Sequence, residues 1–314
     1  METWFWILGW SLSILTITGN GFIIYLVCSR WRLRTKTNAF IVSLAVADFC
    51  VGLTTVPSLF VCEKTTRCDP EALFADGMDF LRWLFVYASA TNLCSLVLDR
   101  YIAVVKPLRY LLFMTRKRVS QMIFISWTLS ILVIFFDVVI WLLSKDKRSL
   151  FLISSWIIVI FLEFLPCCSL IFCFGTMLHI VYKHQRAARM LTKQLRFNQR
   201  FLSRSGEKSA AKVMGIVICL FTLTYTFSLR CSLAHILQSK QTCNDKEYKI
   251  PLLVLNSAVN PVAYAFFKRD LKEQVERCIC CVFWKKRNNI EPLNDLRFFP
   301  NSCDRNVRRT SRIE

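Results

Sequence analysis

The chain has 314 residues, of which 54% are hydrophobic, and it carries a formal net charge of +20 at pH 7. A soluble domain of this length does not need so many apolar residues, so the composition favours a membrane protein over a soluble enzyme. The charges fall in short blocks between long apolar runs, which is typical of a multispanning membrane protein and argues against nucleic acid as a partner.

Seven apolar stretches are long enough to cross a bilayer as helices. They run at 4–28, 38–61, 74–104, 119–143, 150–182, 211–237 and 249–267. The first has no basic segment before it, so we expect a signal anchor and not a cleaved signal peptide. The sequence therefore predicts an all-α seven-transmembrane helix bundle, multi-pass in the plasma membrane.

Lys and Arg are concentrated in the loops at 29–37, 105–118 and 183–212, which lie on one side of such a bundle. The side richer in basic residues faces the cytoplasm. The N-terminus is therefore expected outside the cell and the C-terminus inside it.

The membrane domain is expected to extend to about residue 281. A short amphipathic helix follows the seventh span at about 268–280 and is expected to lie on the membrane surface, in contact with lipid. Three cysteines, Cys278, Cys280 and Cys281, come near its end. They are candidates for S-palmitoylation, with unmodified thiols as the alternative. The remaining tail, 282–314, is polar and basic and is predicted to be disordered.

One carboxylate, Asp48, lies inside the second span, where an acid needs a partner or a cation. Oxygen or amide groups at a similar depth are available on Asn20, Ser89, Asn256, Ser257 and Asn260. Hard cations take such oxygen ligands, so the set is a candidate sodium site. A hydrogen-bonded network with a protonated or hydrated Asp48 is the alternative. We expect no other cofactor.

An acid and a base stand side by side at the cytoplasmic end of the third span, in the triplet Asp99, Arg100 and Tyr101. Such a pair is costly in lipid and is expected to face the protein interior or water. A pair that only marks where the helix leaves the membrane is the alternative. The other spans bear on this choice, because each carries a polar, aromatic or helix-breaking residue at a defined place.

Taken together, these residues resemble the pattern of a rhodopsin-like (class A) G-protein-coupled receptor, without indicating a subfamily. One motif falls on each helix in order: Asn20, Asp48, Asp99-Arg100-Tyr101, Trp127, Pro166 and Asn260-Pro261-Val262-Ala263-Tyr264. The resemblance covers about residues 4–281. It implies a receptor that binds an extracellular small-molecule, lipid or peptide ligand and activates a heterotrimeric G protein.

The resemblance also implies roles for particular residues. Arg100 would receive the C-terminus of the G protein, and Glu207, at the start of the sixth span, would hold Arg100 in the resting state. Asn260, Pro261 and Tyr264 would form the switch of the seventh helix. The candidate sodium ligands Asp48, Ser89, Asn256, Ser257 and Asn260 match the allosteric sodium site of the family.

Two departures from the family pattern stand out. Tyr225 and Phe227 occupy the places of the usual tryptophan and proline of the sixth helix, which predicts a straighter helix and a different switch. The usual disulfide from the third helix to the second outer loop is absent, as in melanocortin and some lysophospholipid receptors. A bridge between Cys62 and Cys68, or from either of them to Cys243, would be a substitute.

Arg82 lies eighteen residues before Arg100, about five helical turns away on the same face, so it should face the extracellular pocket. Biogenic-amine receptors carry an aspartate at this place, so the reversed sign argues against an amine ligand. We expect Arg82 to bind an anionic group, with Arg230 and Tyr225 of the sixth span in the same pocket. The alternative is that Arg82 pairs with Asp79, Asp76 or Glu163, or that its side chain snorkels outward.

Two other classes of function fit the sequence less well. A seven-helix transporter or channel is the alternative to a receptor, but the chain shows no paired halves with matching broken helices. An enzyme is not expected, because no nucleotide-binding loop, nucleophile elbow or metal-ligand motif occurs and the chain has only 3 histidines.

Overall fold

The computed structural model describes residues 3–64, 73–143, 147–194, 205–236, 246–267, 270–275 and 277. Some side chains near the ends of these ranges, including those of residues 61–64 and 205–214, are not described. The chain divides into two units, Met1–Ala263 and Tyr264–Glu314. The helical bundle belongs to the first unit, and in the second unit residues 270–275 are helical, within the range expected for the surface helix.

Long helices cover all seven predicted spans, which confirms the predicted all-α fold. Their bounds are α1 Thr3–Ser29, α2 Lys36–Lys64, α3 Leu73–Val105, α5 Arg116–Leu143, α7 Leu165–Gln194, α8 Ser205–Ile236 and α9 Lys246–Phe267. The fifth span begins earlier, in α6 Lys147–Ile158, and continues through η3 Val159–Phe164 into α7. Among the described residues, five helices are long and apolar enough to cross a membrane, and α8 adds a shorter apolar stretch at Val217–Arg230.

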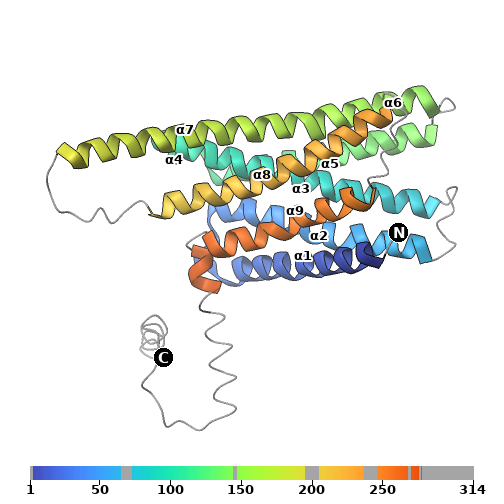
Figure 1. Ribbon diagram of the computed structural model, residues 1–314, viewed down its shortest axis with the longest axis horizontal. Coiled ribbons are helices and arrows are strands. Elements are labelled where there is room, and N and C mark those ends of the chain that lie inside the picture. Colours follow the sequence, from blue (N-terminus) through green and yellow to red (C-terminus); the bar gives the residue numbers. More distant parts are fainter. Residues whose placement is uncertain are drawn as a thin grey trace, which may run out of the picture. The chain divides into compact units, whose positions relative to one another are not determined.

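The helices run lengthwise beside one another (Figure 1), with α1 packed on α2, α2 on α3, and α3 on both α5 and α7. Close approach of α1 and α2 depends on small residues. A Cβ added at Gly52 would lie 2.9 Å from Cγ1 of Ile17. Small residues at helix contacts are what membrane bundles use, because lipid supplies no hydrophobic force between helices.

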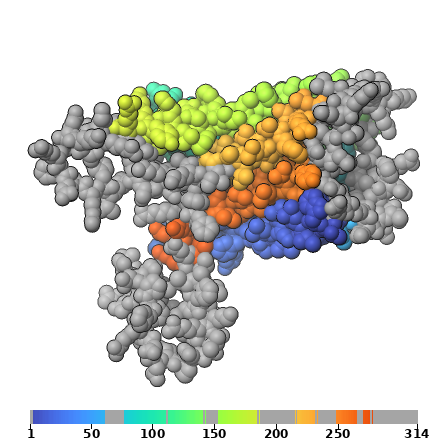
Figure 2. Space-filling view, in the orientation of Figure 1, coloured from blue at the N-terminus to red at the C-terminus, as the bar shows by residue number. Residues whose placement is uncertain are grey.

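The distribution of side chains is the reverse of that in a soluble protein. Large apolar side chains such as Ile7, Phe124 and Phe172 are about two-thirds exposed, while Asp48 and Asn20 are fully buried. Figure 2 shows one face of the molecule, on which α1, α9, α8 and α7 present their outer surfaces. Apolar outer surfaces around a polar interior are expected of a bundle whose solvent is lipid.

The helix that contains Pro166 changes its hydrogen-bond pattern just before the proline. Residues Val159–Phe164 form a π-helical segment, and the Leu165 N–H donates to the Ile160 carbonyl. Proline has no N–H and its ring clashes with the carbonyl four residues earlier, so a wider turn accommodates it without ending the helix. This segment carries Glu163 toward the interior of the bundle, where it is 3% exposed.

Two short elements lie in the loops on the basic side. The 3-10 helix η1, Trp31–Leu33, joins α1 to α2. The helix α4, Pro107–Phe113, follows α3 and begins with a proline, whose fixed φ and missing N–H suit the first turn of a helix.

Candidate functional site

Arg100 is held against the end of its own helix by two neighbours. Its Nη2 lies 2.7 Å from Oδ2 of Asp99 and its Nε 3.1 Å from the same oxygen. The Nη2 group also donates to Oγ1 of Thr37, which lies in the first turn of α2. The Arg100 side chain is 34% exposed and Asp99 is fully buried, so the pair faces the bundle and its rim rather than lipid.

Asp99 has a second partner in the loop helix α4. The Tyr110 hydroxyl donates to Oδ1 of Asp99 over 2.9 Å. Burial raises the pKa of Tyr110, so this phenol stays a proton donor at neutral pH. We call Thr37, Asp99, Arg100 and Tyr110 the arginine latch, since together they fix the guanidinium in one position.

For the other residues predicted to act in activation, the structure describes fewer contacts. Glu207 is the third residue of α8, and its side chain lies outside the described residues. Its pairing with Arg100 therefore stays a prediction. The Tyr101 ring lies 6.4 Å from the Phe172 ring of α7, between centroids. Pro261 and Tyr264 both lie in α9.

A second polar cluster, around Asp48, lies in the middle of the bundle. Ser89 of α3 donates to Oδ1 of Asp48 over 2.5 Å, and Nδ2 of Asn260 in α9 donates to Oδ2 over 2.8 Å. Asn20 of α1 joins α9 by donating to the Ser257 carbonyl over 3.3 Å. The structure thus brings together residues from four helices that the sequence analysis grouped by depth.

Three amide oxygens of this cluster have no hydrogen-bond partner although they are buried. They are the Oδ1 atoms of Asn20, Asn256 and Asn260. Buried polar atoms without a partner are costly, so such a set marks a place for water or an ion. Among the described residues no group of three or more His, Cys, Asp or Glu side chains could hold a metal. One carboxylate with neutral oxygens suits a monovalent cation better than a highly charged one.

Arg82 pairs with Asp79, one of the acids that the sequence analysis named as possible partners. It is 8% exposed and forms a salt bridge with Asp79, one turn earlier in α3. Its Nε is nevertheless buried without a hydrogen-bond partner. Asp79 is 55% exposed, so the pair reaches from the interior of the bundle to its edge. The Nε–H donor of this arginine is therefore both buried and unused.

Trp83, the residue after Arg82, has an aromatic and a cationic neighbour. The Trp83 ring stacks on Tyr87 with centroids 5.6 Å apart, and Nζ of Lys249 lies 5.0 Å from the centroid of the Trp83 ring. From the sixth span, Tyr225 is buried and stacks on Phe221 at 4.1 Å, whereas Arg230 is exposed. The shared pocket of Arg82, Tyr225 and Arg230 stays a prediction.

Glu163 is a buried acid that the sequence analysis considered only as a partner for Arg82. In the structure its Oε1 accepts a hydrogen bond from Ser228 of α8 over 3.0 Å. The signal for a distinct role was present in the sequence, since this is an acid inside an apolar run just before Pro166.

Several predicted sites fall outside what the structure describes. The side chain of Cys62 and all of Cys68 and Cys243 belong to this group, as do the palmitoylation candidates Cys278, Cys280 and Cys281. The substitute disulfide and the lipid attachment stay predictions, and so does the disordered tail.

Comparison with known proteins identifies the family to which the seven helices and their motifs belong. The profile of the family described as "7 transmembrane receptor (rhodopsin family)" matches residues 19–264. The chain is 26% identical to the octopamine receptor beta-2R of Drosophila melanogaster over 88% of its own length, and it spans 62% of that relative. It is also 26% identical to the human histamine H2 receptor, with 86% of this chain and 77% of the relative covered.

A third relative is named as a rhodopsin. The Gq-coupled rhodopsin of Mizuhopecten yessoensis is 25% identical, with 89% of this chain and 61% of that protein covered. These relatives are named for ligands or signals of different kinds, so their shared property is receptor architecture rather than one ligand.

Proposed function

The chain belongs to the rhodopsin family of seven-transmembrane receptors, and from this premise we propose that it activates a heterotrimeric G protein through Arg100. Like its receptor relatives, it is a multi-pass plasma-membrane protein and not an enzyme. The transporter or channel alternative draws no support from the relatives. The observation that carries the proposal is the arginine latch, which places a cation at the cytoplasmic rim under restraint from three helices.

A latch of this kind provides a two-state element. While Arg100 is bound to Asp99 and Thr37, its Nε and Nη2 donors are engaged within the receptor and hold the side chain in one position. An activating ligand must favour the open state enough to offset these contacts, and a change from mostly off to mostly on needs about 5 kcal/mol of differential binding. Hydrogen bonds to charged groups, at about 1.5–3 kcal/mol each, are of the right size for such a balance.

The proposal is tested by G-protein activation in cells that express the unliganded chain, with Arg100→Ala and Glu207→Ala beside it at matched surface expression. A working arginine switch is supported if the wild type or Glu207→Ala gives a signal above background and Arg100→Ala gives none. Signal that persists undiminished in Arg100→Ala contradicts the role of this residue. The Glu207→Ala arm also tests the predicted resting pair.

For the ligand, we infer an anionic group bound near Arg82. What supports this is the buried guanidinium of Arg82, whose Nε has no hydrogen-bond partner and whose charge an amine ligand would meet as like charge. Asp79 neutralises part of that charge, so the ligand would compete with Asp79 for the guanidinium. An amine ligand, as in the octopamine and histamine receptors, would instead need an acid, and Glu163, which is 3% exposed, is a buried acid.

A ligand screen separates these two classes. Fatty acids and lysophosphatidic acid serve as anionic probes, and octopamine and histamine as amines, on the wild type, Arg82→Gln and Glu163→Gln. We expect activation by an anionic probe that weakens about tenfold or more in Arg82→Gln, because a charge-assisted hydrogen bond is lost. Activation by an amine that is lost in Glu163→Gln and retained in Arg82→Gln would contradict the anionic assignment.

We also propose that the Asp48 cluster binds a sodium ion that favours the resting receptor. The fit rests on one buried carboxylate and three buried amide oxygens without donors. Asp48 and Ser89 would supply ligands, and the amides of Asn256 and Asn260 would complete an oxygen shell. The ion would supply positive charge that balances the buried carboxylate.

A further inference from the structure

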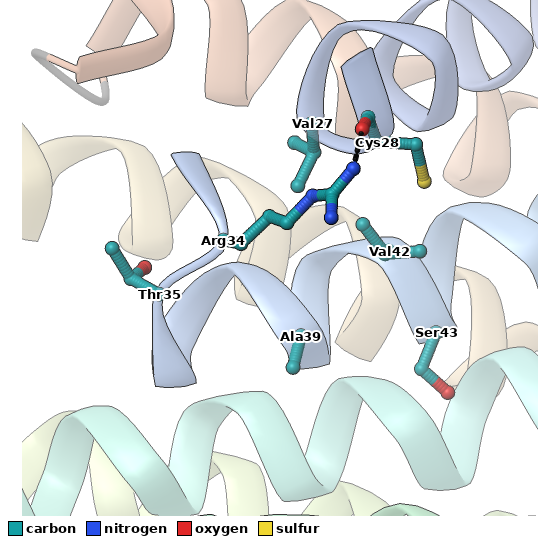
Figure 3. Close-up of a pocket in the computed structure, with 7 residues that line it drawn as sticks. All are labelled: Val27, Cys28, Arg34, Thr35, Ala39, Val42 and Ser43. Atoms are coloured by element: carbon teal, nitrogen blue, oxygen red, sulfur yellow. Dashed lines mark hydrogen bonds between the residues drawn. The ribbon is translucent and has the colours of Figure 1, made fainter. Parts of the chain in front are cut away.

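An open pocket of about 390 Å³ lies where α1 ends and α2 begins (Figure 3). Apolar or small side chains make most of its wall. It is lined by Val27, Cys28, Arg34, Thr35, Ala39, Val42 and Ser43. The positive loops place this end of the bundle on the cytoplasmic side, so the pocket lies at the inner leaflet of the membrane. Neither the arginine latch nor the Asp48 cluster uses it.

The rim of the pocket carries a cation with donors to spare. The Arg34 guanidinium reaches across to the end of α1 and donates to the Cys28 carbonyl over 2.5 Å (Figure 3). Within the described part of the chain this is the one hydrogen bond that its side chain makes, and Arg34 is exposed. A guanidinium has five N–H donors in a fixed fork, which suits phosphate oxygens.

The surrounding loop has the charge and the aromatic residue expected at a lipid headgroup. Arg30, Arg32 and Lys36 flank Arg34, and the sequence has no Asp or Glu between residues 3 and 47. Trp31 is 76% exposed, with the Arg32 guanidinium 5.6 Å from its ring centroid. Tryptophan is enriched at membrane interfaces, and basic clusters beside a cytoplasmic helix end attract anionic lipid.

We propose that this pocket is a binding site for an anionic phospholipid of the cytoplasmic leaflet. The phosphate binds Arg34, and an acyl chain lies along the apolar wall formed by Val27, Ala39 and Val42. The charge of the loop selects a negative headgroup, and the apolar wall requires a chain that a soluble phosphate lacks. The site therefore recognises the whole lipid.

The pocket lies beside the first turn of α2, which carries one residue of the arginine latch. Thr35 lines the pocket, and Thr37, two residues later at the start of α2, accepts the hydrogen bond from Arg100. The proposal itself does not depend on signalling, because lipid binding is measured directly.

The test is native mass spectrometry of the purified full chain in detergent, titrated with phosphatidylserine and, separately, phosphatidylcholine. Three variants separate the contributions. Arg34→Gln removes the cation at the rim, and Val42→Phe fills the pocket while keeping every charge. Arg32→Gln is the matched control, since it removes the same charge from the same loop but does not line the pocket.

We expect the wild type to bind phosphatidylserine in preference to phosphatidylcholine. Arg34→Gln should weaken binding about tenfold or more, because charge-assisted hydrogen bonds are lost. Val42→Phe should weaken it similarly, and Arg32→Gln should stay close to the wild type. Thermal melting verifies that each variant folds, and Ala39→Leu takes the place of Val42→Phe if the latter does not.

Two results would overturn the proposal. Equal losses in Arg32→Gln and Arg34→Gln, with Val42→Phe or Ala39→Leu unchanged, would mean diffuse attraction of lipid to a basic loop. Displacement of phosphatidylserine by an equal concentration of soluble glycerophosphoserine would mean a site for a free phosphate rather than a lipid.

Discussion

At the scale of single residues, two polar clusters connect the helices. Thr37, Asp99 and Tyr110 surround Arg100 from α2, α3 and α4. Asp48 receives hydrogen bonds from α3 and α9. Each cluster buries an acid inside a bundle whose outer surface is apolar. Removing either acid would leave its hydrogen-bond donors without an acceptor.

Sodium should stabilise the wild type, and Asp48→Asn should abolish this effect. At a sodium concentration ten times its Kd, binding to the folded state alone adds about 1.4 kcal/mol of stability. The measurement is the melting temperature of the purified receptor in sodium chloride and in choline chloride at equal ionic strength, since screening is then the same. An equal sodium-induced rise in Asp48→Asn would show that the ion does not bind at this carboxylate.

The contacts of a single residue could be predicted from the sequence only where the residue occupies a defined depth in a membrane span. The partners of Asp48 were predicted because each lies at a similar depth in its span. Thr37 and Tyr110 were not connected to Arg100, because loops and helix starts carry no period that indicates which side chains meet. For Arg82 the sequence left three acids open, and the structure selects Asp79 because it lies one turn away on the same helix.

At the scale of helices, length and hydropathy decide most of the architecture. The seven predicted spans correspond to helices because each is an apolar run whose backbone has no alternative to internal hydrogen bonds in lipid. The helix α4 was missed because seven residues are too few for a hydropathy window. The π-helical turn in η3 was missed because a single wide turn leaves no trace in an apolar run, although Pro166 is its physical cause.

Gly52→Ala should destabilise the contact of α1 with α2. Its Cβ would lie 2.9 Å from Cγ1 of Ile17, a stiff β-branched side chain, so a helix must move. Overpacking of this kind costs about 1–3 kcal/mol. Gly175→Ala is the matched control, because nothing lies within 4 Å of its added Cβ and alanine is the better helix former.

Melting temperature in detergent measures both changes. Gly52→Ala should melt below the wild type, and Gly175→Ala should melt at the same temperature or above it. A rise in both variants would mean that α1 and α2 do not approach as closely at Gly52 as the structure has them.

At the scale of the whole molecule, we propose a receptor that binds its ligand in the outer half and restrains Arg100 at the cytoplasmic rim. The bundle connects the two ends through α3, which carries Arg82 near one end and Arg100 near the other. The proposed lipid pocket lies beside the first turn of α2, which contains Thr37. We propose that the latch keeps the receptor off.

The most direct measurement is ligand-independent G-protein activation by Thr37→Val, which removes the acceptor for Arg100 with little change of shape. We expect the equilibrium to move about tenfold toward the active state, because a hydrogen bond to a charged group is lost. Adding Arg100→Ala to Thr37→Val should abolish the gain. Thr54→Val is the matched control on the same helix, since the hydroxyl of Thr54 bonds, within the described residues, only to the Cys50 carbonyl of its own helix. Activity in Thr37→Val no higher than in Thr54→Val, or a gain that survives Arg100→Ala, would contradict the latch.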